Sequence, residues 1–215
     1  MEFSSFFPIP KPIITLWVII GVIALLSFLA TRNLKETPGP LQNIAEIVVA
    51  RLKNFFSEII GEKYARKYLP LFATEFIVII VSNYTGLLPG AGEFFAVPTA
   101  NLSVAAGLAI VTFVMTHALG NIERGPKGYL KSFLQPIAFM LPFTLIDQVV
   151  RPFSLALRLY GNMYAEETVV EQLRGIFPIG LPIVMMVLSL IFCLIQAMVF
   201  TMLSAVYIGE AMGVD

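Results

Sequence analysis

Six polar or ionisable residues recur at helical spacing inside an otherwise apolar stretch of this chain. They are separated by 4, 3, 4, 4 and 4 positions, so a helix places them along one slowly winding stripe. The polar stripe consists of Asp147, Arg151, Ser154, Arg158, Asn162 and Glu166. Polar groups at membrane depth need polar partners or water, so we expect this stripe to face protein or an aqueous path. Such residues inside a membrane segment are typical of ion and proton pathways.

Arg158 is the most unusual member of the polar stripe. A cation at the centre of a membrane helix costs about 2.5–3.5 kcal/mol on insertion scales. Its guanidinium stays protonated, so it forms a barrier to a passing cation. An acid on a partner chain could be held ionised beside it, because a nearby positive charge lowers the pKa of a carboxyl group. We therefore expect Arg158 to face a polar cavity or another chain.

Carboxylates lie near both ends of the polar stripe. Asp147 lies on one side of the central arginine, and Glu166 and Glu167 lie on the other. This arrangement suits two aqueous paths that each reach half-way across a membrane. Two structural alternatives stay open: Asp147 could pair with Arg151 across one helical turn, and Glu167 with Glu171 could form a solvated helix end.

A second, weaker set of polar residues recurs near the end of the chain. Ser189, Gln196, Ser204 and Tyr207 are spaced by 7, 8 and 3 positions. Gln196 lies among apolar residues and needs a hydrogen-bond partner, for which the polar stripe is the natural candidate. A path-lining role and simple adhesion between helices are both open.

The composition indicates an integral membrane protein. Of 215 residues, 58% are hydrophobic and only 13% are charged, against about 25% in soluble domains. Fourteen basic and fourteen acidic residues balance, which argues against nucleic-acid binding. The single Cys193, expected to be a buried apolar residue, excludes a disulfide within the chain, and neither it nor the single His117 can build a metal cluster. We expect no cofactor and no metal.

Five stretches are apolar and long enough to cross a membrane, so the expected fold is all-α and polytopic, a single integral membrane domain over 1–215. They are 13–30, 69–88, 101–119, 133–168 and 176–208. The last two exceed the roughly 20 residues that a perpendicular helix needs, so they must tilt, kink or lie partly along the membrane. Pro136, Pro142 and Pro152 predict a bend near the start of the fourth. The first stretch lacks a clear cleavage site and is expected to be a retained helix.

Residues 41–67 differ from these spans because apolar and charged residues fall on different sides of a helix. This pattern predicts an amphipathic helix at the membrane interface, or one packed on a partner. Glu75 follows soon after and is expected to extend toward the interface, and His117 is expected to be interfacial too.

Basic residues predict the orientation. They cluster between the first and second spans and between the third and fourth, whereas the loop over 89–100 has Glu93 and no Lys or Arg. Cytoplasmic loops are enriched in basic residues, so the N-terminus is expected outside and the C-terminus inside.

The run RPFSLALRLYGNMYAEE over 151–167 resembles the signature of the a subunit of F-type ATP synthases. Four further stretches agree with that family in the same order: SNYTGLLPG (82–90), PTANLSV (98–104), GYLKSF (128–133) and IQAMVFTMLSAVY (195–207). The resemblance implies a stationary, non-catalytic subunit with two offset half-channels for protons. Its implied partners are a rotating ring of c subunits, b-type peripheral-stalk subunits and other ATP synthase subunits in a bacterial plasma membrane.

By this resemblance, Arg158 matches the essential arginine that faces the ring, and Asn162, Glu167 and Gln196 match polar residues of the outer path. Three positions depart from the family pattern. Glu166 replaces a residue that is often Gly or His, Ser189 replaces one that is often titratable, and Thr144 replaces an acidic residue fourteen positions before the arginine. We therefore expect the outer path to titrate on Glu166 and Glu167, and Asp147 to serve the cytoplasmic path.

Two other functional classes, and one other coupling ion, stay open. Na⁺ could replace the proton in the same role. A secondary transporter would predict repeated halves, and no repeat is visible. An intramembrane hydrolase would need His117 beside Ser154 or Ser189, and no third orienting group is evident, so we expect no catalytic residue.

Overall fold

The computed structural model describes residues 10–32, 39–88, 96–133, 139, 141–176 and 180–214. The regular structure of these residues is entirely helical, which confirms the predicted fold class. The elements are α1 (Lys11–Thr31), α2 (Pro40–Tyr84), η2 (Thr85–Leu87), η3 (Pro98–Ala100), α3 (Leu102–Ser132), α4 (Leu141–Ile176) and α5 (Gly180–Met212). By length and apolar composition, α1, α2, α3 and α5 could each cross a membrane. Helix α4 carries the ionisable residues of the polar stripe and packs against α3 and α5.

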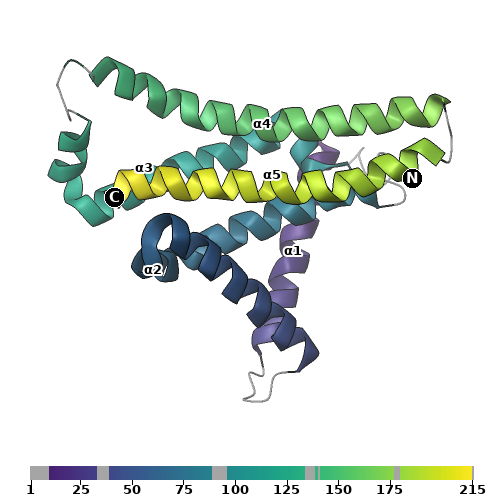
Figure 1. Cartoon of the computed structure of the whole chain (residues 1–215), viewed down its shortest axis with the longest axis horizontal. Helices are drawn as coiled ribbons and strands as arrows, with labels where there is room; N and C mark the ends of the chain where they lie inside the picture. The colour runs from purple at the N-terminus through teal and green to yellow at the C-terminus, as the bar shows by residue number, and fades with distance from the viewer. Residues whose placement is uncertain are drawn as a thin grey trace.

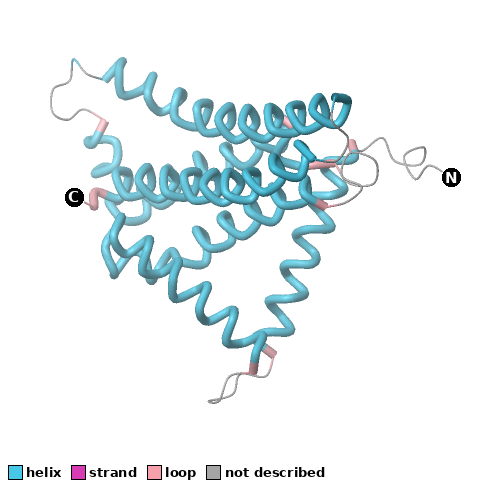
Figure 2. Tube along the Cα trace, turned by 45° about the vertical axis from the view of Figure 1, so that its right-hand side comes forward, coloured by secondary structure: helices cyan, strands magenta, loops and turns pink. Residues whose placement is uncertain are grey.

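Helices α3, α4 and α5 run beside one another, with the second part of α2 packed on the same group (Figure 1). Helix α5 contacts α2, α3 and α4. Helix α1 and the first part of α2 extend away from this group, and both views show them converging at the bottom of the picture (Figure 2). The two helices that carry the candidate site, α4 and α5, are therefore neighbours along most of their length.

The two site helices are longer than a bilayer is thick. Helix α4 has 36 residues and α5 has 33. At 1.5 Å per residue they measure about 54 and about 50 Å, against a hydrocarbon core of about 30 Å. The fourth predicted span, 133–168, corresponds to α4, which starts at Leu141 and continues to Ile176, and the fifth, 176–208, corresponds to α5.

Prolines bend this region less than predicted. Helix α4 stays helical through Pro152, and Pro142 lies in its first turn, where a missing backbone N–H costs nothing. Pro136 lies outside the described residues.

Helix α2 joins the two segments that the sequence separated into 41–67 and 69–88. Its backbone breaks at Gly61, where φ is 78°, a conformation that side chains rarely allow. The amphipathic segment thus ends at an elbow six residues earlier than predicted. Helix α3 bends the same way at Gly125, with φ of 71°, directly before Pro126. Both elbows turn a membrane helix toward a more polar segment.

The apolar face of the first part of α2 is only partly covered by this chain. Leu52, Phe56 and Ile60 are buried. By contrast, Ile44 and Ile47 are 61% and 52% exposed. The turns nearest the elbow therefore pack on the rest of the chain, and the first turns leave an apolar surface uncovered.

Small side chains bring α3, α4 and α5 close together. Ala105 and Ala109 of α3, Ala156 of α4 and Ala197 of α5 are all at most 5% exposed. Small residues let membrane helices approach closely. In lipid the hydrophobic effect does not drive helices together, so van der Waals contact between them contributes more to their association. This packing fixes the register between the polar residues of α4 and those of α5.

Candidate functional site

A groove of about 430 Å³ opens between the C-terminal half of α4 and the N-terminal half of α5. We call it the outer groove. Four of the polar residues predicted from sequence line it: Asn162, Glu166, Ser189 and Gln196. The rest of its wall is apolar, formed by Met163, Ala165, Val169, Met185, Phe192 and Ile195. The tertiary structure thus brings together residues that are up to 34 positions apart.

A hydrogen bond joins the two helices within the outer groove. The amide nitrogen of Asn162 donates to Oε1 of Gln196 at 2.6 Å. This contact confirms that the partner of Gln196 lies on the polar stripe. Gln196 is 5% exposed and Ser189 is 1% exposed, so the floor of the groove is polar and buried. The Nε2 amide of Gln196 has no partner among the described residues.

Glu166 is held half-buried in the wall of the groove. Its two carboxylate oxygens lie 3.8 and 3.9 Å from Sγ of Cys193, which is fully buried, as predicted for this cysteine. In the described part of the chain no basic residue forms an ion pair with Glu166 or with the neighbouring Glu167, which is exposed. This end of α4 therefore presents acids without a counter-ion among the described residues.

A second cavity, of about 230 Å³, lies at the opposite end of the same helices. We call it the inner cavity. It is bounded by α3, α4 and α5, and its polar lining includes Gln148, Arg151, Tyr207 and Glu210. Arg151 forms an ion pair with Glu210, and its guanidinium lies 4.9 Å above the Tyr207 ring. Here the carboxylate and the cation neutralise each other.

The pairing of Asp147 with Arg151 that the sequence left open is not formed. Arg151 pairs across the helix interface with Glu210 instead. Asp147 is exposed on α4 and does not line the inner cavity. An i, i+4 pair within one helix is worth only a few tenths of a kcal/mol, so a partner on a facing helix can displace it.

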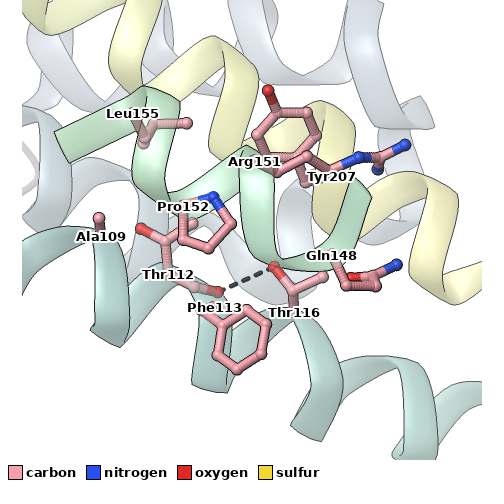
Figure 3. Close-up of a pocket in the computed structure, with 9 residues that line it drawn as sticks. All are labelled: Ala109, Thr112, Phe113, Thr116, Gln148, Arg151, Pro152, Leu155 and Tyr207. Carbon is pink, nitrogen blue, oxygen red and sulfur yellow. Dashed lines mark hydrogen bonds between the residues drawn. The ribbon is translucent and has the colours of Figure 1, made fainter. Parts of the chain in front are cut away.

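A third pocket continues from the inner cavity into the protein. Its volume is about 20 Å³, and it shares Thr116, Gln148, Arg151 and Tyr207 with the inner cavity. Figure 3 shows Arg151 and Tyr207 close together on one side of this small pocket, with Thr112 and Thr116 of α3 on the other. Oγ1 of Thr116 donates to the backbone carbonyl of Thr112 at 2.8 Å (Figure 3).

Arg158 lies on α4 between the outer groove and the inner cavity, four residues from Asn162 and seven from Arg151. Its side chain is exposed, and it makes neither an ion pair nor a hydrogen bond with any residue that the structure describes. A methyl group added at Gly161, one turn away, would meet nothing within 4 Å. Leu159, the residue after Arg158, is fully buried, so the covered side of α4 begins there. Arg158 therefore belongs to an open face of α4.

Glu75 does not extend toward the membrane interface, so that expectation is wrong. Its Oε1 accepts hydrogen bonds from the hydroxyls of Thr112 on α3, at 2.5 Å, and Ser204 on α5, at 3.2 Å. His117 bonds through Nδ1 to the hydroxyl of Tyr129, and its ring packs on Phe113. Neither of these two contacts of His117 is with a serine, so they give no support to the intramembrane hydrolase.

Glu210 is the functional candidate that sequence reasoning missed. It lies three positions after Tyr207 and so extends the second set of polar residues by one turn. This three-residue spacing from Tyr207 could have identified Glu210 from the sequence. Glu75 and Thr112 carried no comparable signal, because they lie on different helices and each is alone in an apolar run.

Comparisons with known proteins agree with this architecture. The profile of a family described as ATP synthase A chain matches residues 13–209. "ATP synthase subunit a 3" of Pelobacter propionicus is 44% identical over 196 residues, covering 89% of this chain and 83% of that protein. "ATP synthase subunit a 1" of Syntrophotalea carbinolica is 42% identical over 200 residues, covering 91% and 83%. "ATP synthase subunit a" of Moorella thermoacetica is 38% identical over 203 residues, covering 94% and 91%.

Proposed function

This chain belongs to the ATP synthase A chain family, and from that premise we propose that it is the stationary subunit through which protons cross the membrane to drive the complex. It is a multi-pass membrane protein and a non-catalytic member of a multi-subunit ATP synthase. The finer proposal concerns its two half-channels and the rotor that they serve.

One observation carries the proposal: Arg158 is exposed and unpaired within the described chain, midway between two cavities at opposite ends of α4 and α5. A cation in that position needs an anionic partner from outside the chain. A ring of c subunits, each with a membrane carboxylate, supplies such a partner. The space beside Gly161 leaves room for a rotor helix to pass closely.

The outer groove is the proposed entry for protons. Glu166 lines the groove and Glu167 is its exposed neighbour on α4. Neither pairs with a basic residue within the described chain, so each carboxylate can bind a proton and release it. Asn162 and Gln196 supply polar groups deeper in the groove, and Ser189 completes its polar wall. A proton delivered there neutralises a ring carboxylate, which can then leave Arg158 and move into lipid.

The inner cavity is the proposed exit. A ring carboxylate that returns toward Arg158 gives up its proton there, because the guanidinium favours the ionised acid. Gln148 and the Arg151–Glu210 pair line the route, with Asp147 on the adjacent turn of α4. Each proton crossing is worth about 2.3 kcal/mol per 100 mV, so several crossings must be gathered for each ATP.

The same proposal gives the orientation and the other partners. The inner cavity holds Arg124 as well as Arg151, and basic residues favour the cytoplasmic side. The C-terminus is then cytoplasmic and the N-terminus outside, in a bacterial plasma membrane. The uncovered apolar turns of α2 around Ile44 and Ile47 leave a surface for lipid or for b-type stalk subunits.

The decisive test replaces the central cation. Arg158→Ala, in the whole ATP synthase reconstituted into vesicles, is expected to abolish ATP-driven proton pumping while the soluble sector still hydrolyses ATP. Pumping is measured by quenching of a pH-sensitive dye and hydrolysis by phosphate release. Arg66→Ala removes an exposed cation of α2 that lines neither cavity and should leave most pumping intact. Normal coupled pumping by Arg158→Ala would refute the proposal.

A further inference from the structure

Glu75 is an acid inside the helix group that the two proposed half-channels do not use. It projects from α2 to the junction with α3 and α5, where both of its hydrogen bonds are donated by hydroxyl groups. Among the described residues it forms no ion pair with a Lys, Arg or His. A carboxyl group in an apolar setting without a cation favours its protonated form. Glu75 is thus chemically suited to hold a proton.

The structure connects this carboxyl group to the inner cavity through Thr112. The Thr112 hydroxyl lies 2.5 Å from Oε1 of Glu75, and Thr112 also lines the small pocket of about 20 Å³. That volume suffices for one water molecule, which needs roughly 10–15 Å³ and two to four polar partners. Thr116, Gln148, Arg151 and Tyr207 also line the small pocket and can serve as such partners (Figure 3). The same four residues reach the inner cavity.

Ser204 offers a contrast on the other side of the carboxyl group. Its hydroxyl donates to the same Oε1 at 3.2 Å and also to the backbone carbonyl of Phe200 at 3.1 Å. It does not line the small pocket or the inner cavity. Both hydroxyls therefore donate to the same oxygen of Glu75, but only that of Thr112 belongs to a residue that lines the small pocket.

We propose that Glu75 is a proton-holding residue of the inner path and exchanges its proton with the inner cavity through the Thr112 hydroxyl and water in the small pocket. This inference rests on the proposed function and adds a residue to it. On loading, a hydronium ion in the pocket transfers a proton to Oγ of Thr112, while the O–H bond of Thr112 breaks and its proton bonds to Oε1 of Glu75. On release the same transfers run in reverse, so protons and charge balance.

The proposed role is that of a side store beside the route, and not a step that every proton must take. A store next to the exit keeps a proton acceptor available whenever a ring carboxylate arrives. Its loss should therefore slow proton transfer without stopping it. This distinguishes Glu75 from Arg158, which touches every passing ring carboxylate in the proposed mechanism.

The experiment reconstitutes the whole complex into vesicles and then strips off the soluble sector, so that passive proton conduction through the membrane sector can be measured. Glu75→Gln keeps an oxygen that can accept both hydroxyl bonds but cannot carry the proton. We expect conduction to fall about threefold to tenfold, less than the roughly hundredfold minimum for a positioned acid–base group, because Glu75 lies beside the route and not on it. Glu62→Gln, at a carboxylate that is 79% exposed, is the matched control and should conduct normally.

A second pair of variants separates proton transfer from packing. Thr112→Val and Ser204→Ala each remove one hydroxyl bond to Glu75, but only the first cuts the connection to the small pocket. We expect Thr112→Val to reproduce the loss seen with Glu75→Gln. Ser204→Ala should conduct within about twofold of the native protein, because the hydrogen bond from Thr112 to Glu75 and the small pocket are both kept.

Two results would overturn the inference. Normal conduction by an assembled Glu75→Gln complex would make Glu75 a structural hydrogen-bond acceptor only. Equal effects of Thr112→Val and Ser204→Ala would mean the same, and this comparison decides the matter if Glu75→Gln does not assemble. Either result leaves the proposed function standing, because that depends on Arg158→Ala in the same vesicles.

Discussion

The carboxylates at the two ends of the α4–α5 pair differ in whether a cation lies beside them. In the outer groove, Glu166 is half-buried beside Cys193 and has no cation within the described chain. In the inner cavity, Glu210 forms an ion pair with Arg151. The same two helices therefore offer acids ready to bind protons at one end and a neutralised acid at the other.

This difference suits opposite tasks. An acid without a counter-ion binds a proton more readily, because no nearby cation favours its ionised form. An acid beside a guanidinium stays ionised and gives up a proton more readily. Entry from the proton-rich side and exit to the proton-poor side would need this order. In the proposed mechanism, the pairing of carboxylates thus distinguishes the two ends of the path.

The largest effect is expected when the outer acids are neutralised together. Glu166→Gln with Glu167→Gln leaves the groove its shape but removes both proton-binding groups. ATP-driven pumping should fall at least about a hundredfold, which is the lower end of the range for loss of positioned acid–base groups. The measurement is dye quenching in vesicles at matched ATP hydrolysis. Glu171→Gln, on the same helix beyond the groove, is the control, and an equally active double variant would break the comparison.

An intermediate effect is expected at the inner end, where two acids can be compared. Glu210→Gln removes the partner of Arg151 in the cavity, whereas Asp147→Asn changes an exposed residue on the adjacent turn. Because the Arg151–Glu210 pair is partly exposed, its loss should cost at most about 1 kcal/mol of stability.

Pumping should fall severalfold with Glu210→Gln and less with Asp147→Asn, measured in the same assay. The reverse order would move the inner path away from the cavity and onto the exposed face of α4. Equal and full activity would remove both acids from the exit route.

The smallest effect is expected for the hydrogen bond that joins the helices in the outer groove. Gln196→Leu removes the acceptor of the Asn162 amide and also a buried amide that lacks a partner of its own. A hydrogen bond is worth about 0.5–1.5 kcal/mol, so pumping should fall only about twofold to tenfold.

Stability of that variant should barely change, since an unsatisfied buried group is removed with the bond. Heating the purified complex and following release of the subunit tests this. Strong destabilisation would assign Gln196 to helix adhesion, the alternative that the sequence left open.

Much of the fold followed from the sequence because membrane burial imposes long apolar segments with internally bonded backbone. The all-α class, the long site helices and the polar stripe were all readable from composition and spacing. Spacing also predicted that Gln196 bonds to the stripe, because a buried amide in an apolar helix has few possible partners. Helix boundaries were harder to predict from the sequence. The elbow at Gly61 depends on the backbone conformation of one residue, which the neighbouring residues do not indicate.

The sequence by itself determined which side chains share a helix face, since 3.6 residues per turn fix that without reference to other helices. It also determined that Arg158 would need a partner. Only the tertiary structure decided which faces meet. Arg151 selects Glu210 over Asp147, and Glu75 turns inward to two hydroxyls, because close packing through alanines sets the register between helices. Pairing across an interface depends on that register, which no local pattern encodes.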